Sequence, residues 1–146
     1  MLFKTMMSAR VILAASVLFG SVNAAMQEPA KPVVPPTKAG KALTDFVESF
    51  NAGGDKRKAF LEERTTIAKE GHANILGQDA KFLQTNGAMT LVRVPSSSDD
   101  NITAILRFAT GGLHVHLTLG LDPAAPDKIT TMRLRPATPE EIKGGL

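Results

Sequence analysis

The feature that most constrains the fold is a strict two-residue alternation of side chains between residues 113 and 121. The odd positions are all apolar, namely Leu113, Val115, Leu117, Leu119 and Leu121. The even positions are polar or small, namely His114, His116, Thr118 and Gly120. Successive side chains of a strand point to opposite faces of a sheet, so this segment is predicted to be a strand with one buried apolar face.

The same period continues in three further segments of the C-terminal half. They are residues 89–94, 102–108 and 129–135, with segments rich in Gly, Pro, Ser or Asp between them. Parallel strands need crossovers of about a dozen or more residues, and the connections here are shorter. The pattern therefore predicts a four-stranded antiparallel sheet made of neighbouring hairpins, with a turn over residues 95–100.

Before residue 88 the apolar side chains recur with a helical period. They predict a helix over residues 37–51, with one apolar face formed by Leu43, Phe46, Val47 and Phe50. Asp55 is placed to cap a second helix, in which we expect the basic run at residues 56–58 to be solvated. A break at Gly71 would precede a third helix over residues 73–84. Helices first and sheet second indicate an α+β domain, with the N-terminal helices packed on the antiparallel sheet.

The N-terminal residues have the pattern of an export signal. Lys4 and Arg10 precede an apolar run over residues 11–19, which is shorter than the roughly 20 residues of a transmembrane helix. Small side chains follow this run, and we place the cleavage after Ala24. The chain is therefore predicted to be exported, either periplasmic or secreted, and not to span a membrane once residues 1–24 are removed.

The rest of the chain is expected to hold a single domain. Residues 25–38 are rich in proline and are predicted to form an extended tether. The folded domain is expected over residues 39–138, and a C-terminal tail over residues 139–146.

Charge and composition argue against several functions. Two of the 17 Lys and Arg residues lie in the export signal, so 15 basic and 14 acidic residues remain and the net charge is near +1. Together with the absence of Tyr and Trp, this charge gives no support for nucleic-acid binding. The absence of Cys excludes disulfides, thiol catalysis and Cys-ligated zinc.

Several local strings resemble those of a known superfamily. They are residues 45–55, 91–94, 111–112, 117–129 and 133–136. With the order of elements, they are similar to the nuclear transport factor 2-like superfamily, also called cystatin-like or polyketide-cyclase-like. The resemblance is to a small bacterial exported domain, often found N-terminal to a serine-hydrolase or peptidase domain. It implies helices in the concave face of a curved sheet, around a cone-shaped pocket. The Ser-x-x-Lys and Gly-x-Ser-x-Gly motifs of such hydrolases are absent.

The sequence His114-Val115-His116 is the sharpest local motif. Two residues' rise places the imidazoles about 6–7 Å apart on one strand face, which is close enough to share a metal ion. A metal site would need a third ligand, such as His72 or Glu48. The alternative interpretation is that both rings simply lie on the polar face of the sheet.

Enzymes of the resembled superfamily place an Asp, His or Tyr inside the cone as general base or oxyanion donor. The candidates for such a role here are His114, His116 and Asp45, and the two histidines are also the metal-binding candidates. The chain has no Tyr, so only part of this set of groups is present. No cofactor is expected.

The leading hypothesis is a non-enzymatic binding or accessory domain for an apolar small molecule or for a protein partner such as a hydrolase. Binding would use the apolar residues Phe46, Phe50, Leu113, Val115, Leu117 and Leu119. An anion or an acidic partner surface would be held if one sheet face gathers Arg93, Arg107, Arg133 and Arg135. The alternative is a small lyase or isomerase that uses a His or a carboxylate in the cone. A homodimer through a strand face is left open.

Overall fold

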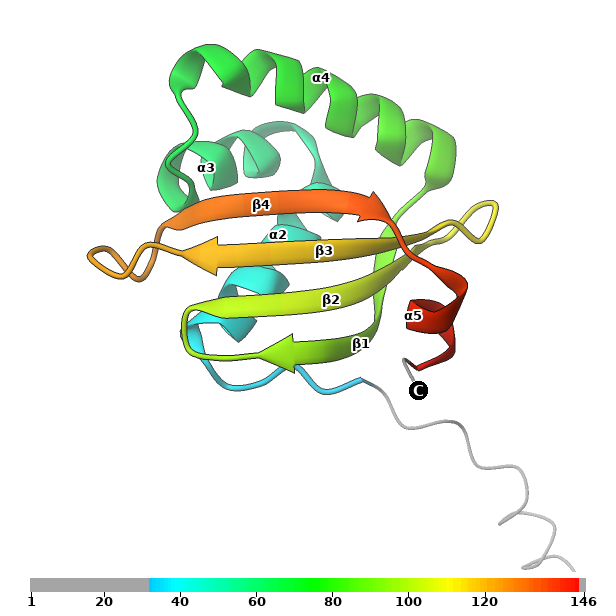
Figure 1. Cartoon of the computed structure of the whole chain (residues 1–146). Coiled ribbons are helices and arrows are strands. Elements are labelled where there is room, and N and C mark those ends of the chain that lie inside the picture. The colour runs from blue at the N-terminus through cyan, green and yellow to red at the C-terminus, as the bar shows by residue number, and fades with distance from the viewer. Residues whose placement is uncertain (1–31, 145–146) are drawn as a thin grey trace, which may run out of the picture. The chain divides into compact units, whose positions relative to one another are not determined.

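The computed structural model describes residues 32–144 and contains helices followed by strands (Figure 1). The elements are α2 (Lys38–Ala52), α3 (Gly54–Arg64), α4 (Lys69–Asn86), β1 (Met89–Ser97), β2 (Asn101–Phe108), β3 (His114–Leu121), β4 (Ile129–Pro136) and α5 (Pro139–Lys143). The predicted export signal and residues 25–31 of the predicted tether lie outside the described residues. Within residues 32–144, no helix has the length and apolar character needed to cross a membrane.

The strands form an open antiparallel sheet in the order β1-β2-β3-β4, which confirms the predicted hairpin arrangement. β1 is the irregular strand, because its register with β2 shifts on both sides of Arg93. Such irregularities bend a strand and increase its twist. The turn predicted over residues 95–100 is wrong at its start, since β1 continues through Pro95 to Ser97. Proline is tolerated there because β1 is an edge strand.

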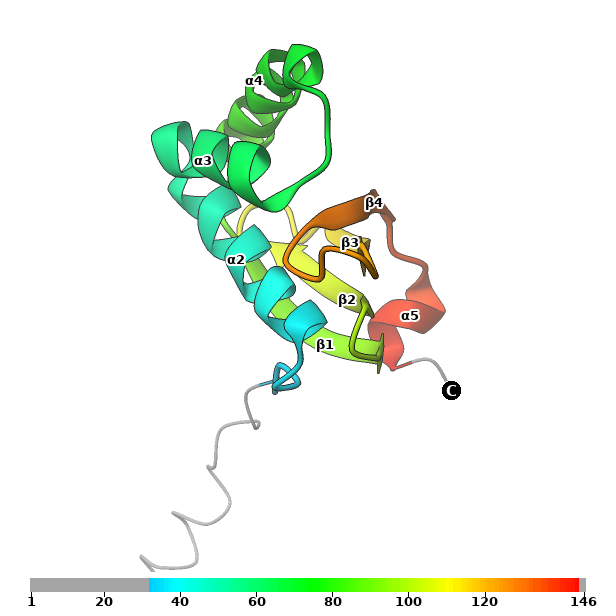
Figure 2. The ribbon, with the colours of Figure 1, turned by 90° about the vertical axis from the view of Figure 1, so that its left-hand side faces the viewer.

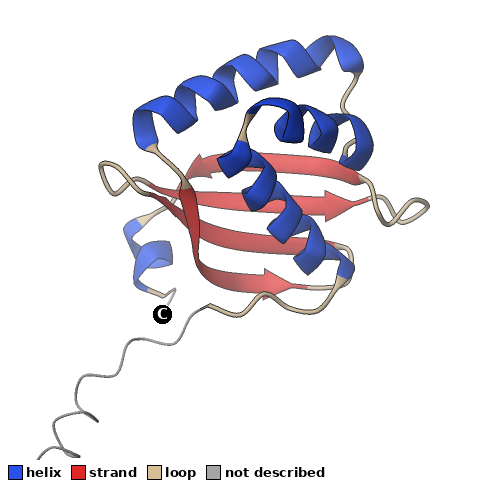
Figure 3. Ribbon diagram, turned by 180° about the vertical axis from the view of Figure 1, so that it is seen from behind, coloured by secondary structure: helices blue, strands red, loops and turns tan. Residues whose placement is uncertain are grey.

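Three helices cover one face of the sheet, and the short helix α5 lies on the opposite face (Figure 2). Figure 3 views the sheet from the helical side, where α2 crosses the strands. The core lies between α2 and the inward side chains of the strands, among them Phe46, Phe108, Leu117 and Leu119. The fold is therefore α+β, with three helices packed against a four-stranded antiparallel sheet.

Two predicted helix boundaries are wrong. The residue that caps α3 is Gly53 and not Asp55, which lies in the first turn of the helix. Only Gly53 separates α2 from α3, and its φ of 65° suits glycine at this sharp reversal. Gly71 does not precede the third helix, because α4 begins at Lys69 and includes it. A glycine in the first turn costs little, because that turn is already close to an end of the helix.

The basic run at residues 56–58 is only partly solvated, contrary to the prediction. Arg57 is 2% exposed, whereas Lys56 and Lys58 are exposed. The Arg57 guanidinium is buried because Asp79 balances its charge through a 2.7 Å contact and the Ser49 hydroxyl accepts a further hydrogen bond. This arginine therefore links α3 to α2 and α4.

Candidate functional site

The apolar residues predicted to bind a ligand lie in the hydrophobic core. Phe46, Phe50, Val115, Leu117 and Leu119 are at most 3% exposed, and the partly buried Leu113 packs against the same core cluster. The odd residues of β3 thus face the helices, as the alternation predicts. Their surfaces are used by packing within the domain, and of these residues Phe50 also lines a cavity between the helices.

The two histidines of the His-x-His motif lie on the other face of the sheet. Nδ1 of His114 is 2.8 Å from the Gly112 carbonyl oxygen, and Nε2 of His116 is 3.8 Å from a carboxylate oxygen of Glu141. The third ligands considered, Glu48 and His72, belong to α2 and α4 in the helical layer. In the part of the chain from 32 to 144, no group of three or more His, Cys, Asp or Glu residues is arranged to hold a metal ion.

Asp45, the remaining catalytic candidate, forms ion pairs near the surface of the helical layer. Its carboxylate lies 3.0 Å from Nζ of Lys41 and 2.5 Å from Nη1 of Arg64. These contacts join two turns of α2 and tie α2 to α3. The structure therefore does not bring Asp45 together with His114 and His116.

The four predicted strand arginines do gather on one face. Arg93 pairs in register with Ile105, Arg107 with His114, Arg133 with Thr118, and Arg135 with His116. All of these positions alternate with the core-facing residues, so the arginines point away from the helices. The four strands contain no Asp or Glu. We call this surface the outer face, and it carries a marked excess of positive charge.

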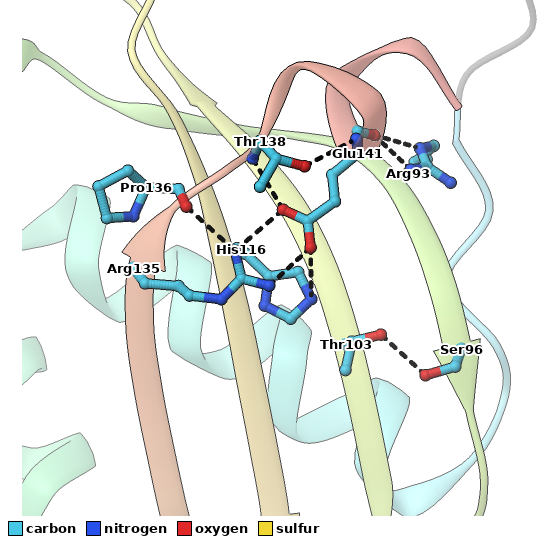
Figure 4. A network of polar contacts seen from close by, with 8 residues as sticks. All are labelled: Arg93, Ser96, Thr103, His116, Arg135, Pro136, Thr138 and Glu141. Atoms are coloured by element: carbon cyan, nitrogen blue, oxygen red, sulfur yellow. Dashed lines mark hydrogen bonds and ion pairs between the residues drawn. The ribbon is translucent and has the colours of Figure 1, made fainter. Parts of the chain in front are cut away.

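The charged partner of the outer face within the described chain comes from α5 (Figure 4). The Glu141 carboxylate accepts hydrogen bonds of 2.6 and 3.0 Å from the two terminal nitrogens of Arg135. The Glu141 carbonyl oxygen accepts a 3.1 Å hydrogen bond from Nε of Arg93 and a second from Nη2. Ile105 lies between Arg93 and His116 in register and is fully buried, as expected for a side chain beneath these contacts.

The geometry strongly favours the ionised form of Glu141. Hydrogen bonds from Arg135 and from the Thr138 backbone N–H lower the pKa of Glu141 from about 4.5 to about 2, and the charges of Arg135 and His116 act in the same direction. Reciprocally, the hydrogen bond to Glu141 raises the pKa of Arg135. The outer face therefore already binds one carboxylate in a two-pronged geometry, which is the mode in which arginine recognises acidic groups.

A groove of about 530 Å³ runs along β4 beside this contact. Its walls include Thr118, Arg133 and Arg135 from the outer face, and Met132 and Leu134 from the other side of β4. Leu134 is 44% exposed although it pairs with the buried Leu117. The groove therefore combines positive charge on one side of the strand with apolar surface on the other.

Sequence reasoning missed α5, because residues 139–146 were assigned to a tail. A usable signal exists in Thr138-Pro139-Glu140-Glu141, which has the spacing of a capping box followed by proline at the first helical position. The structure forms both hydrogen bonds of the box, between the Thr138 and Glu141 side chains and each other's backbone N–H. This signal predicts a short helix but not the sheet face on which it lies.

Comparison with protein-family models, with curated proteins and with solved structures finds no match for this chain. The outer face and the cavities of the described residues are therefore the features that bear on function.

Proposed function

We propose that this domain is a non-enzymatic binding module that takes an extended acidic segment of a protein partner along β4. The observation that carries the proposal is the gathering of four arginines on one face of strands that contain no acidic residue. An excess of one charge on a surface steers and holds partners of the opposite charge.

The free edge of β4 supports this mode of binding. β4 is the last strand of the sheet and pairs with β3 along its length. On its other side, the backbone hydrogen bonds from the described chain reach only its start, where Thr65 forms a bridge with Ile129 and the Thr66 N–H donates to the Ile129 carbonyl oxygen. The N–H and C=O groups further along β4 are therefore available to an added strand, which is how several peptide-binding domains capture extended ligands.

The side chains of β4 suggest the sequence of the partner segment. Arg133 points to the outer face, whereas Met132 and Leu134 point to the helical side. An added strand would alternate in the same way, with acidic residues on the Arg133 side and apolar residues against Leu134. A second copy of the domain fits less well, because antiparallel pairing of two β4 strands would bring arginines close to arginines.

Glu141 provides an internal example of the expected contact. Its carboxylate binds Arg135 with two hydrogen bonds and lies next to His116. The Arg133 side chain has no hydrogen bond or ion pair with any residue between 32 and 144, and the residue is exposed. An acidic side chain of a partner would thus meet a guanidinium that is not already used.

The test uses a fluorescent peptide of alternating glutamate and valine. A peptide of the same length with lysine in place of glutamate is the control for the sign of the charge. We expect anisotropy to show binding of the acidic peptide only, with an affinity that falls as salt rises. Arg133→Glu should weaken this binding by about tenfold or more, since it replaces attraction with repulsion.

The matched control is Lys58→Glu, which makes the same charge change at an exposed position of α3. This variant should keep the affinity of the unmodified domain within about twofold, because Lys58 does not line the groove along β4 and exposed charges are screened by salt. Equal binding of the lysine–valine peptide, or an equal loss in both variants, would overturn the proposal.

We further infer that the domain is exported and that its fold is of the nuclear transport factor 2-like type, with a cone-like sheet. Export is supported by the basic start, apolar run and small residues of the first 24 positions. The fold type is supported by the order of helices before strands and by the irregular, bent β1. The mass of the chain recovered from outside the cytoplasm would show whether residues 1–24 have been removed.

A further inference from the structure

A second candidate site lies in the helical layer, away from the outer face. A cavity of about 280 Å³ opens where the end of α2, the start of α3 and the middle of α4 meet. Phe50, Leu76, Ala80 and Leu83 give it an apolar wall, and Arg57 with Asp79 provides its charged groups. Ligand pockets for drug-sized molecules usually exceed about 300 Å³, so this cavity suits a smaller molecule.

The Arg57 guanidinium at this cavity is held rigidly. Its planar group lies over the Phe46 and Phe60 rings, with distances of 4.6 and 5.0 Å from its central carbon to the ring centres. Nη1 donates to the Ser49 hydroxyl at 2.9 Å and to the Phe46 carbonyl oxygen at 3.4 Å. A donor fixed in this way loses little conformational entropy when it binds a ligand.

One nitrogen of Arg57 is left for a ligand. Nε donates to Oδ2 of Asp79 at 2.7 Å, and Nη1 is used as described, but Nη2 has no hydrogen-bond partner among residues 32–144. Over the same residues, the only fully buried side-chain nitrogen or oxygen without a partner is Nδ1 of His72. Nη2 therefore retains some exposed surface, and because Arg57 lines the cavity, we infer that Nη2 faces it.

The charge of the site limits the chemistry of the ligand. Arg57 and Asp79 already balance each other, and a carboxylate entering the cavity would approach the Asp79 carboxylate. Oδ1 of Asp79 takes no hydrogen bond from the described residues, so the ion pair offers one free donor and one free acceptor, beside the Gln84 side chain that also lines the cavity. A neutral hydroxyl or primary amide satisfies both, because it can accept from Nη2 and donate to Oδ1.

We propose that this cavity binds a small neutral molecule with a short hydrocarbon tail and a hydroxyl or amide head. The tail would lie against Phe50, Leu76 and Leu83, and the head between Arg57 and Asp79. The proposal goes beyond peptide binding at β4 and is independent of it, because the two sites share no residue.

The probes are hexan-1-ol, hexanamide and sodium hexanoate, added to the ¹⁵N-labelled domain at neutral pH. Hexan-1-ol and hexanamide should shift the amide signals of residues around the cavity, including Gly53, Gly54 and Ala80. Hexanoate should bind at least about tenfold more weakly, because its charge meets Asp79 in a partly dehydrated site.

Ala80→Phe places a large ring at the cavity wall, on a residue that is exposed and therefore tolerant of substitution. We expect it to weaken hexanamide binding by about tenfold or more. Ala73→Phe is the matched control, because Ala73 is exposed on the same helix and does not line the cavity.

Two results would overturn the proposal. One is hexanamide shifts in the unmodified domain that map away from the cavity, a readout that needs no variant. The other is hexanoate binding as tightly as hexanamide, which would show that the Arg57 and Asp79 pair does not select a neutral head. Binding of the acidic peptide at β4 should be unchanged in Ala80→Phe, so failure at one site can be told from failure at the other.

Discussion

The two faces of the sheet are built from alternate residues of the same strands, yet they are stabilised in different ways. The helical face consists of apolar side chains that α2 covers, and Leu117 and Leu119 have no exposed surface there. The outer face carries arginines and histidines, and its charged contacts come from one short helix. The comparison indicates that the helical face determines stability, whereas the outer face carries the recognition that we propose.

The largest expected effect is a difference in stability between substitutions at two neighbouring residues of β3. Leu117→Ala removes a fully buried side chain from the core and should lower the free energy of unfolding by about 2–5 kcal/mol. Thr118→Ala changes the adjacent residue on the outer face. It should alter the free energy of unfolding by no more than about 0.5 kcal/mol. Urea denaturation measures both. Similar losses in the two variants would contradict the division between the faces.

The next largest effect on stability is expected when two arginines, each paired with one acidic residue, are replaced in turn. Arg57→Met should lower the free energy of unfolding by about 2–4 kcal/mol, because Asp79 and the Ser49 hydroxyl lose a partner in a buried setting. Arg135→Met removes a half-exposed partner of Glu141. Its urea midpoint should be indistinguishable from that of the unmodified domain. A loss of unfolding free energy from Arg135→Met as large as that from Arg57→Met would show that the outer face also contributes to stability.

A smaller effect is expected where α2 meets β1. The Asn51 side chain accepts a 2.8 Å hydrogen bond from the Met89 N–H and donates one of 2.9 Å to the Met89 carbonyl oxygen. Asn51→Ala leaves both backbone groups of a buried residue without this partner, so we expect a loss of about 1–3 kcal/mol. Asn74→Ala, an exposed change on α4, serves as the control and should be neutral in the same urea series.

The sequence predicts the helical face well because its signal is local. The alternation over residues 113–121 requires only neighbouring residues, and the structure confirms both the strand and its buried odd positions. The clustering of the four strand arginines could also be foreseen, as one outcome of that same period. These features follow from side-chain direction along a strand.

What the sequence does not reveal depends on contacts between distant residues. Nothing in the basic run at 56–58 shows that Arg57 meets Asp79, which lies 22 positions later, so its burial could not be predicted. The contact of Glu141 with Arg93 spans 48 positions and fixes where α5 lies. The position of Gly71 inside α4 shows a further limit, since a glycine in the first turn of a helix need not mark the helix boundary.

The smallest effect on stability is expected at the Glu141 contact, and it is best measured by its pH dependence. The folded domain lowers the pKa of Glu141 to about 2 from an ordinary value near 4.5, so the ionised form favours the docked position of α5. The stabilisation of the docked α5 by the ionised carboxylate is complete above about pH 4.5 and is lost as the pH falls through about 2. Carbon-13 NMR of the Glu141 carboxyl reports its protonation, and the amide signals of residues 139–143 report the release of α5. The two titrations should share one midpoint.

Arg135→Gln should raise that midpoint towards 4.5, because the Arg135 hydrogen bonds are the largest cause of the lowered pKa. Arg133→Gln removes an equal charge from the neighbouring outward position of β4 and should leave the midpoint near 2, since Arg133 does not contact Glu141. A midpoint near 4.5 in the unmodified domain would mean that α5 does not rest on the outer face in solution. In that case Arg135 and His116 would be open together with Arg133, and the peptide-binding surface that we propose would be larger than the groove along β4.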